Sequence, residues 1–154
     1  MTNSVLAVFK TSCFWAAFCA WFTAQCTKML VGFWRTHRLD FSYVVSTGGM
    51  PSAHSATVAG LATALGITQG FNAPIFVMGL AFAVLTMFDA STVRRAAGMQ
   101  ARLLNEIIDE LFKTHRFSER KLKELLGHTR LEVFMGMIIG ILVAVIVTSL
   151  AVAT

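Results

Sequence analysis

The chain has 154 residues, enough for one domain but too few for two of ordinary size. Hydrophobic residues make up 56% and charged residues 14%, whereas soluble domains average roughly 45–50% and about 25%. The net charge of +5 comes mainly from basic residues beside apolar runs, the arrangement that orients membrane proteins, so we expect the bilayer and no nucleic acid as partner. These properties exclude a water-soluble enzyme, a disordered chain and a disulfide-stapled secreted module.

Long uncharged runs predict membrane-spanning helices. Residues 41–88 and 133–154 contain no Lys, Arg, Asp or Glu, and uncharged runs of about 18 or more residues are typical of transmembrane segments. The first run is long enough for two crossings, with a break at residues 70–74, where Gly, Asn and Pro interrupt it. A Phe-, Trp- and Ala-rich stretch near the start of the chain adds another crossing. The four predicted spans cover residues 5–26, 51–69, 75–89 and 133–150.

A charged segment, residues 91–130, separates the third and fourth spans. Apolar residues recur within it three, four or seven positions apart, with charged residues between them: Val93, Ala97, Leu104, Ile108 and Leu111. This spacing predicts an amphipathic helix along the membrane surface or over the bundle, and a shorter basic helix, residues 118–126, should follow and end at Gly127. We therefore expect one all-α domain, residues 1–154, an integral membrane helical bundle with about four transmembrane helices and an amphipathic cytoplasmic helix.

Four spans place both termini on one side of the membrane and both basic segments on the other. Because loops rich in Lys and Arg face the cytoplasm, we expect the basic loops there. Lys28, His54, His128 and the Arg94–Arg95 pair then lie at one membrane face, although 100 positions separate the first from the last. The sequence predicts a multi-pass membrane protein with its site on the cytoplasmic face.

The string Gly48-Gly49-Met50-Pro51-Ser52-Ala53-His54-Ser55 carries the strongest chemical signal. Two glycines allow a turn, and Pro51 with Ser52 is typical of a helix start, whose amide groups attract anions. His54, one turn inside, is placed to give a proton to such an anion. The alternative is a plain helix start with a buried, hydrogen-bonded histidine. An ionisable residue inside an uncharged membrane segment favours the functional interpretation.

Two further strings add charged groups. Asp89 ends an apolar span, and Arg94 and Arg95 follow within two turns; arginine matches phosphate oxygens, although plain cytoplasmic anchors would look the same. His128 and Glu132 are four residues apart, so on a helix they lie on one face within hydrogen-bond reach. A carboxylate in that place holds an imidazole in one tautomer, whereas the plainer interpretation is a capped helix start with a polar pair.

Together these strings resemble those of the divergent type 2 phosphatidic acid phosphatase family, membrane proteins related to acid phosphatases and vanadium-dependent haloperoxidases. The similarity extends from about Lys28 to Ile141. It rests on four strings: Gly48 to Ala56, Asp89 with Arg94-Arg95, Ala97-Gly98-x-Gln100-Ala101-x-x-x-Asn105, and Leu122-Lys123-Glu124-Leu125-Leu126-Gly127-His128.

The chain keeps the first two of the three motifs of the wider superfamily with one change in each. Lys28 and Arg35 have the spacing of the first motif, but Thr36 replaces the proline that follows the arginine. The second motif, Pro-Ser-Gly-His, matches residues 51–54 except that Ala53 replaces the glycine. An alanine keeps the backbone donor, so this second change is mild.

The third motif, Ser-Arg followed by His and Asp, is present only in its second half. His128 and Glu132 fit that half, whereas Lys121 and Leu122 occupy the Ser-Arg positions. We take Arg94 or Arg95 as the substitute for the missing arginine.

The resemblance implies a phosphatase mechanism. His128 would be the nucleophile and form a phosphohistidine, Glu132 would orient it, and His54 would protonate the leaving oxygen. The phosphate would be bound by Lys28, Ser52, Arg94 and Arg95, with support from Arg35 and Asp89. Hydrolytic relatives need no metal and the sequence has no metal-ligand cluster, so no cofactor is expected. Access from the bilayer implies a phosphorylated lipid substrate, either a lipid phosphate or a polyprenyl diphosphate.

Three functions stay open at this point. One is hydrolysis of a lipid phosphate or polyprenyl diphosphate. The second, favoured by the incomplete third motif, is a non-hydrolytic lipid-phosphate binder or transporter built on the same site. The third is a structural membrane protein without activity.

Gly136 and Gly140 form a Gly-x-x-x-Gly pair in the last span, which predicts close helix packing either within the bundle or in a homo-oligomer.

Overall fold

The computed structural model describes residues 5–37, 49–111 and 128–153, and the regular structure of these residues is entirely helical. This confirms the all-α fold. A 3-10 turn, η1, leads into five α-helices. Their bounds are η1 Val5–Lys10, α1 Ser12–Thr36, α3 Ala53–Gln69, α4 Pro74–Ser91, α5 Val93–Leu111 and α6 Arg130–Ala153.

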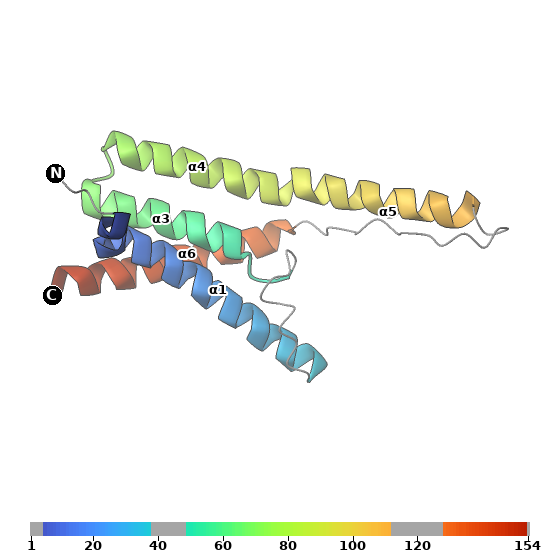
Figure 1. Cartoon of the computed structure of the whole chain (residues 1–154), viewed down its shortest axis with the longest axis horizontal. Coiled ribbons are helices and arrows are strands. Elements are labelled where there is room, and N and C mark those ends of the chain that lie inside the picture. The colour runs from blue at the N-terminus through green and yellow to red at the C-terminus, as the bar shows by residue number, and fades with distance from the viewer. Residues whose placement is uncertain (1–4, 38–48, 112–127, 154) are drawn as a thin grey trace.

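Helix α3 is the centre of the bundle, because it packs against α1, α4 and α6 (Figure 1). Its interfaces are built from small residues, which let helix backbones approach closely. Alanines alone form two of the buried clusters: Ala20, Ala24, Ala53 and Ala56 in one, and Ala16, Ala64 and Ala144 in another. Gly60 lies so close to α1 that an added Cβ would be 2.9 Å from the Ala20 Cβ. Small side chains therefore fix how tightly the helices pack.

Gly136 and Gly140 of α6 lie inside the bundle against α3. Added Cβ atoms there would overlap the carbonyl oxygens of Ser52 and Ala56, respectively. Of the two alternatives predicted for this pair, close packing within the bundle is present in the structure. A homo-oligomer through the same face stays a prediction.

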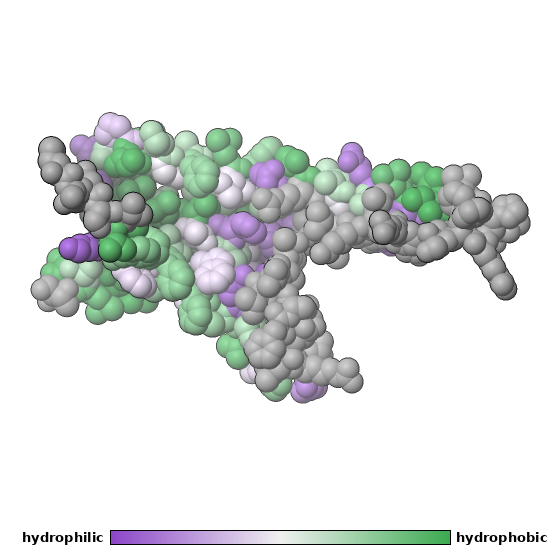
Figure 2. Space-filling model, in the orientation of Figure 1, coloured by the Kyte–Doolittle hydropathy of each residue, from purple (hydrophilic) through white to green (hydrophobic). Residues whose placement is uncertain are grey.

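The bundle has an apolar surface, as expected for a protein in a membrane (Figure 2). Two segments of the described chain, Pro74–Ile108 and Arg130–Val152, are long and apolar enough to cross a bilayer by length and composition. Helix α3 has 17 residues and is about 26 Å long, shorter than a bilayer core of about 30 Å. The predicted count of four spans stays a prediction.

The observed helices differ from the predicted spans mainly in α1. The sequence predicted a span that ends at residue 26 and a polar segment after it, but α1 continues as a helix to Thr36. The other spans agree with α3, α4 and α6 within about three residues. The predicted basic helix, residues 118–126, and its stop at Gly127 lie outside the described residues.

The amphipathic helix predicted after the third span is present as α5. It continues in nearly the same direction as α4 and extends beyond the bundle (Figure 1). Among the described helices it contacts α4 and no other. It therefore does not cover these helices, which was one of the two predicted placements.

The end of α4 and the starts of α3 and α6 meet at one end of the bundle, which we call the site end (Figure 1). Helix α1 runs toward this end, but its last turns diverge from the other helices. The 3-10 turn η1 and the last turn of α6 lie at the opposite end. The site end thus collects residues that are far apart in the sequence.

Candidate functional site

Backbone hydrogen bonds connect the segments that meet at the site end. The Ser52 amide, at the start of α3, donates to the Glu132 carbonyl oxygen of α6 at 3.0 Å. The His128 amide donates to the Ala90 carbonyl oxygen of α4 at 3.2 Å. These two bonds hold the starts of α3 and α6 against the end of α4, and so they place His128 among three helices.

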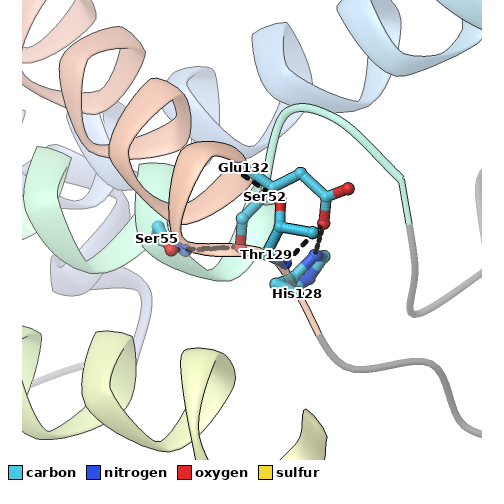
Figure 3. A network of polar contacts seen from close by, with 5 residues as sticks. All are labelled: Ser52, Ser55, His128, Thr129 and Glu132. Carbon is cyan, nitrogen blue, oxygen red and sulfur yellow. Dashed lines mark hydrogen bonds and ion pairs between the residues drawn. The ribbon is translucent and has the colours of Figure 1, made fainter.

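Glu132 holds the His128 ring through a helix cap (Figure 3). Thr129 precedes α6, and its hydroxyl accepts the Glu132 amide at 3.3 Å, while Glu132 Oε2 accepts the Thr129 amide at 3.1 Å. This reciprocal pair is a capping box. The same Oε2 atom is 3.0 Å from Nδ1 of His128. An ionised carboxylate only accepts hydrogen bonds, so Nδ1 carries a proton and the lone pair of neutral His128 lies on Nε2.

The predicted proximity of His128 and Glu132 is confirmed, but its cause differs from the predicted one. His128 lies before α6 and is not part of the helix. The contact forms because Glu132, at the third helical position, turns back to cap the helix start. His128 itself is buried, with 2% of its surface exposed.

Ser52 joins two helix starts. Its side chain is the N-cap of α3: Oγ accepts the Ser55 amide at 3.4 Å and the Ser55 hydroxyl at 3.0 Å. The residue is completely buried, and its own amide is engaged by Glu132. The predicted helix start at Pro51-Ser52 is therefore confirmed. Phosphate binding by Ser52 stays a prediction.

His54 lies beside His128. It is the second residue of α3 and is exposed, and the centres of the two imidazole rings are 6.3 Å apart. The plain alternative of a buried histidine is therefore wrong. An exposed imidazole next to a buried, oriented one is a suitable geometry for proton exchange with a bound group.

Lys28 supplies a positive charge from α1 and is 4% exposed. Its stem lies beside Gly49, where an added Cβ would be 3.7 Å from Cγ and Cδ of the lysine. Lys28 lies beyond the predicted end of the first span. Burial lowers the pKa of its ammonium below the ordinary 10.5, and the Glu132 carboxylate opposes that shift. Lys28 and Glu132 therefore lie within electrostatic reach of each other.

The other predicted ligands are placed differently. Asp89 lies in the last turn of α4, directly before Ala90, and is partly exposed. Arg94 and Arg95 both lie in the first turn of α5, where the Arg95 side chain is exposed. Arg35 lies in the last turn of α1, an end that diverges from the other helices (Figure 1). The phosphate-binding roles of these arginines stay predictions.

Arg130 is a basic residue near the site that sequence reasoning missed. It is the first residue of α6, two positions after His128, and it lines a cavity of about 460 Å³ between α4 and α6. The sequence signal for it is a basic residue between the candidate nucleophile His128 and the apolar run that starts at Val133. Arg130 is therefore another candidate, beside Arg94 and Arg95, for the missing arginine of the third motif.

Metal binding has no support from the described part of the chain, where no group of three or more His, Cys, Asp or Glu residues is arranged to hold an ion.

Comparisons with known proteins identify the family of the chain. The model of a family described as the Divergent PAP2 family matches residues 9–143, which confirms the resemblance inferred from the motifs. The chain is 40% identical over 134 residues to the uncharacterized membrane protein YuiD of Bacillus subtilis (strain 168), covering 80% of this chain and 85% of the relative. No solved structure matches the chain. The family match includes every residue of the site end described above.

Proposed function

The chain belongs to the Divergent PAP2 family, and from that premise we propose that it hydrolyses a phosphorylated membrane lipid, with His128 as the nucleophile. The observation that carries the proposal is the 3.0 Å contact between His128 Nδ1 and Glu132 Oε2, since it fixes the tautomer that leaves Nε2 able to attack phosphorus. Lipid monophosphates and polyprenyl diphosphates are the two substrate classes. The membrane location agrees with that of the relative YuiD, and a site on the cytoplasmic face is part of this proposal.

The reaction has two steps. His128 Nε2 attacks phosphorus, an N–P bond forms, and the P–O bond to the lipid breaks while a protonated His54 gives its proton to the leaving oxygen. In the second step a water molecule attacks phosphorus, His54 takes the proton from that water, and the N–P bond breaks. Inorganic phosphate leaves and both histidines return to their starting states. Glu132 stabilises the positive charge that develops on the His128 ring.

Several positive groups at the site end support binding of a phosphate. The N-termini of α3 and α6 meet there, and a helix N-terminus carries about half a positive charge in exposed amide groups. Lys28 and Arg130 add two side-chain cations from α1 and α6. Glu132 offsets part of this charge. The remaining positive field favours an anion whose negative charge grows in the transition state.

Phosphate release by the purified protein in lipid nanodiscs tests the proposal, with a panel of lipid monophosphates and polyprenyl diphosphates. His128→Asn should reduce turnover to the background rate, because Asn has no nucleophilic imidazole. His37→Asn is the matched control, since His37 is exposed at the end of α1 and its backbone φ of 51° suits asparagine. Turnover that persists in His128→Asn would overturn the proposal.

A non-hydrolytic binder or transporter of lipid phosphates is the second candidate. The observation that favours it is the incomplete third motif, together with the position of Arg95 on exposed α5. In this case the wild-type protein would bind a lipid phosphate without releasing phosphate, and His128→Asn would keep most of the affinity. Binding measured on the same nanodiscs therefore separates the two candidates.

A further inference from the structure

A groove between α4 and α6 opens beside the candidate site. Its volume is about 460 Å³, within the range of ordinary ligand pockets. The lining residues come from the halves of the two helices nearest the site end: Val84, Met87, Phe88, Ser91, Thr92, Arg130, Val133, Phe134 and Met137. Helix α4 packs mainly on α3, and so this side of α4 is left partly open toward α6.

The groove is apolar along most of its length and polar only at one end. Val84 and Met137 lie away from the site end, whereas Ser91, Thr92 and Arg130 lie at it. The polar end is continuous with the site, because the His128 amide donates to Ala90, the residue before Ser91, and Arg130 follows two positions after His128. A molecule that fills the groove would thus present one end to the candidate nucleophile.

We infer that the groove binds one hydrocarbon chain of a membrane lipid phosphate, and that Arg130 binds the phosphate of that lipid next to His128. Three observations identify the occupant: the apolar lining, the guanidinium at one end only, and the exposure of groove residues such as Val84 on a helix that qualifies as a membrane span. A water-soluble phosphate ester has no hydrocarbon chain that could fill the apolar part of the groove. The inference rests on the proposed function and adds the lipid-chain site and Arg130 to it.

A tryptophan in the groove tests the chain site. Val84→Trp fills the groove, and Leu85→Trp is the matched control, since Leu85 is its exposed neighbour on α4 but does not line the groove. With palmitoyl chains, Val84→Trp should lower kcat/KM by about tenfold or more, which corresponds to roughly 1.4 kcal/mol. With butanoyl chains, whose hydrocarbon is too short to need the groove, both variants should match the wild type.

Equal effects of both tryptophans, or an effect of Val84→Trp that is the same for short and long chains, would overturn the chain site. Absence of turnover in the wild type with every lipid would instead overturn the proposed function. The two failures are therefore distinguishable.

A binding readout keeps the inference testable without turnover. A phosphatidic acid with a photoreactive diazirine at the end of one chain should crosslink to Val84 and Met137 more than to Leu85 or Ile146, which lie outside the groove. Arg130→Gln should remove this preference, and diacylglycerol with the same diazirine should not show it, because it lacks the phosphate. Uniform labelling of all four positions by phosphatidic acid would contradict the inference.

Discussion

At the scale of single residues, the Oε2 atom of Glu132 has two tasks. It accepts the Thr129 amide, which caps α6, and it accepts Nδ1 of His128, which orients the imidazole. The same atom therefore links the stability of a helix start to the chemistry proposed for the site. Removal of the whole side chain would disturb both tasks, so a variant that separates them is needed.

Glu132→Gln separates the two tasks, because an amide oxygen still accepts hydrogen bonds but carries no charge. We expect its unfolding midpoint to stay near that of the wild type, while turnover falls by about 10²-fold or more as the developing charge on His128 loses its partner. Glu132→Ala should lose turnover and also about 1 kcal/mol of stability through the broken cap. Phosphate release and thermal unfolding in detergent measure the two effects. Wild-type turnover in Glu132→Gln would exclude a charge-stabilising role for the carboxylate.

The contact of His128 with Glu132 could be predicted from local spacing, whereas contacts between distant segments, such as that of Ser52 with Glu132, could not. Ser52 and Glu132 were recognisable as helix-start residues, which is why α3 and α6 begin where expected. Arg95 was expected near His128 because the predicted topology places both residues at one membrane face. The direction of a helix after a turn depends on a few backbone angles, here at Thr92, and these send α5 away from the bundle. Hydrophobic spacing carries no information about such angles.

At the scale of helices, the α3–α6 interface depends on the absence of side chains at Gly136 and Gly140. The backbone of α6 lies against the carbonyl groups at the start of α3, and this contact holds Ser52 beside Glu132. The spacing of the glycines predicted close packing, but it did not identify the partner helix. Identification of α3 required the structure, because alanine-rich helices offer similar faces.

Gly136→Ala should force α6 away from α3, since the new Cβ would overlap backbone atoms of Ser52 that have no freedom to move aside. We expect a loss of about 1–3 kcal/mol in stability, the usual range for overpacking, and a loss of turnover. Gly79→Ala is the matched control, because its Cβ would overlap only the end of the flexible Leu65 side chain, at 2.8 Å, and would make an ordinary contact with the Ala62 Cα at 3.8 Å. Thermal unfolding in detergent compares the two. An equal midpoint for both variants would show that the interface tolerates the methyl group.

Helix α1 shows where hydropathy is a poor guide to helix length. The predicted span ended at Cys26 because Lys28 and Arg35 lower the local hydropathy, yet apolar residues such as Leu30 and Phe33 continue between them. A single buried lysine does not interrupt a helix when its long stem packs beside Gly49 and a carboxylate is within reach. The sequence contains both residues, but not the fold that brings them together.

At the scale of the whole molecule, the arrangement of the helices predicts which segments are reached from each side of the membrane. Helix α1 runs toward the site end and α5 starts there, whereas the turn between α3 and α4 lies at the opposite end. If the basic segments face the cytoplasm, His37 and Arg95 belong to that side and Asn72 to the other.

Cysteine labelling tests this topology. After Cys13, Cys19 and Cys26 are replaced by serine, single cysteines are introduced as His37→Cys, Arg95→Cys and Asn72→Cys, all at exposed positions. A membrane-impermeant maleimide should label the first two in inside-out vesicles and the third in right-side-out vesicles. Labelling of Asn72→Cys and Arg95→Cys from the same side would rule out the predicted arrangement of spans.

The hydrogen bond between Ser52 and Glu132 has a consequence for biosynthesis. The two residues are 80 positions apart, so at usual rates of translation Glu132 is made roughly 4–16 s after Ser52. During that interval α3 has its N-cap but lacks the helix that covers its glycine and alanine face. The short α3 therefore lacks this partner until α6 has been made. Assembly of the site consequently waits for α6, and a nascent chain that stops before α6 lacks the contact between Ser52 and Glu132.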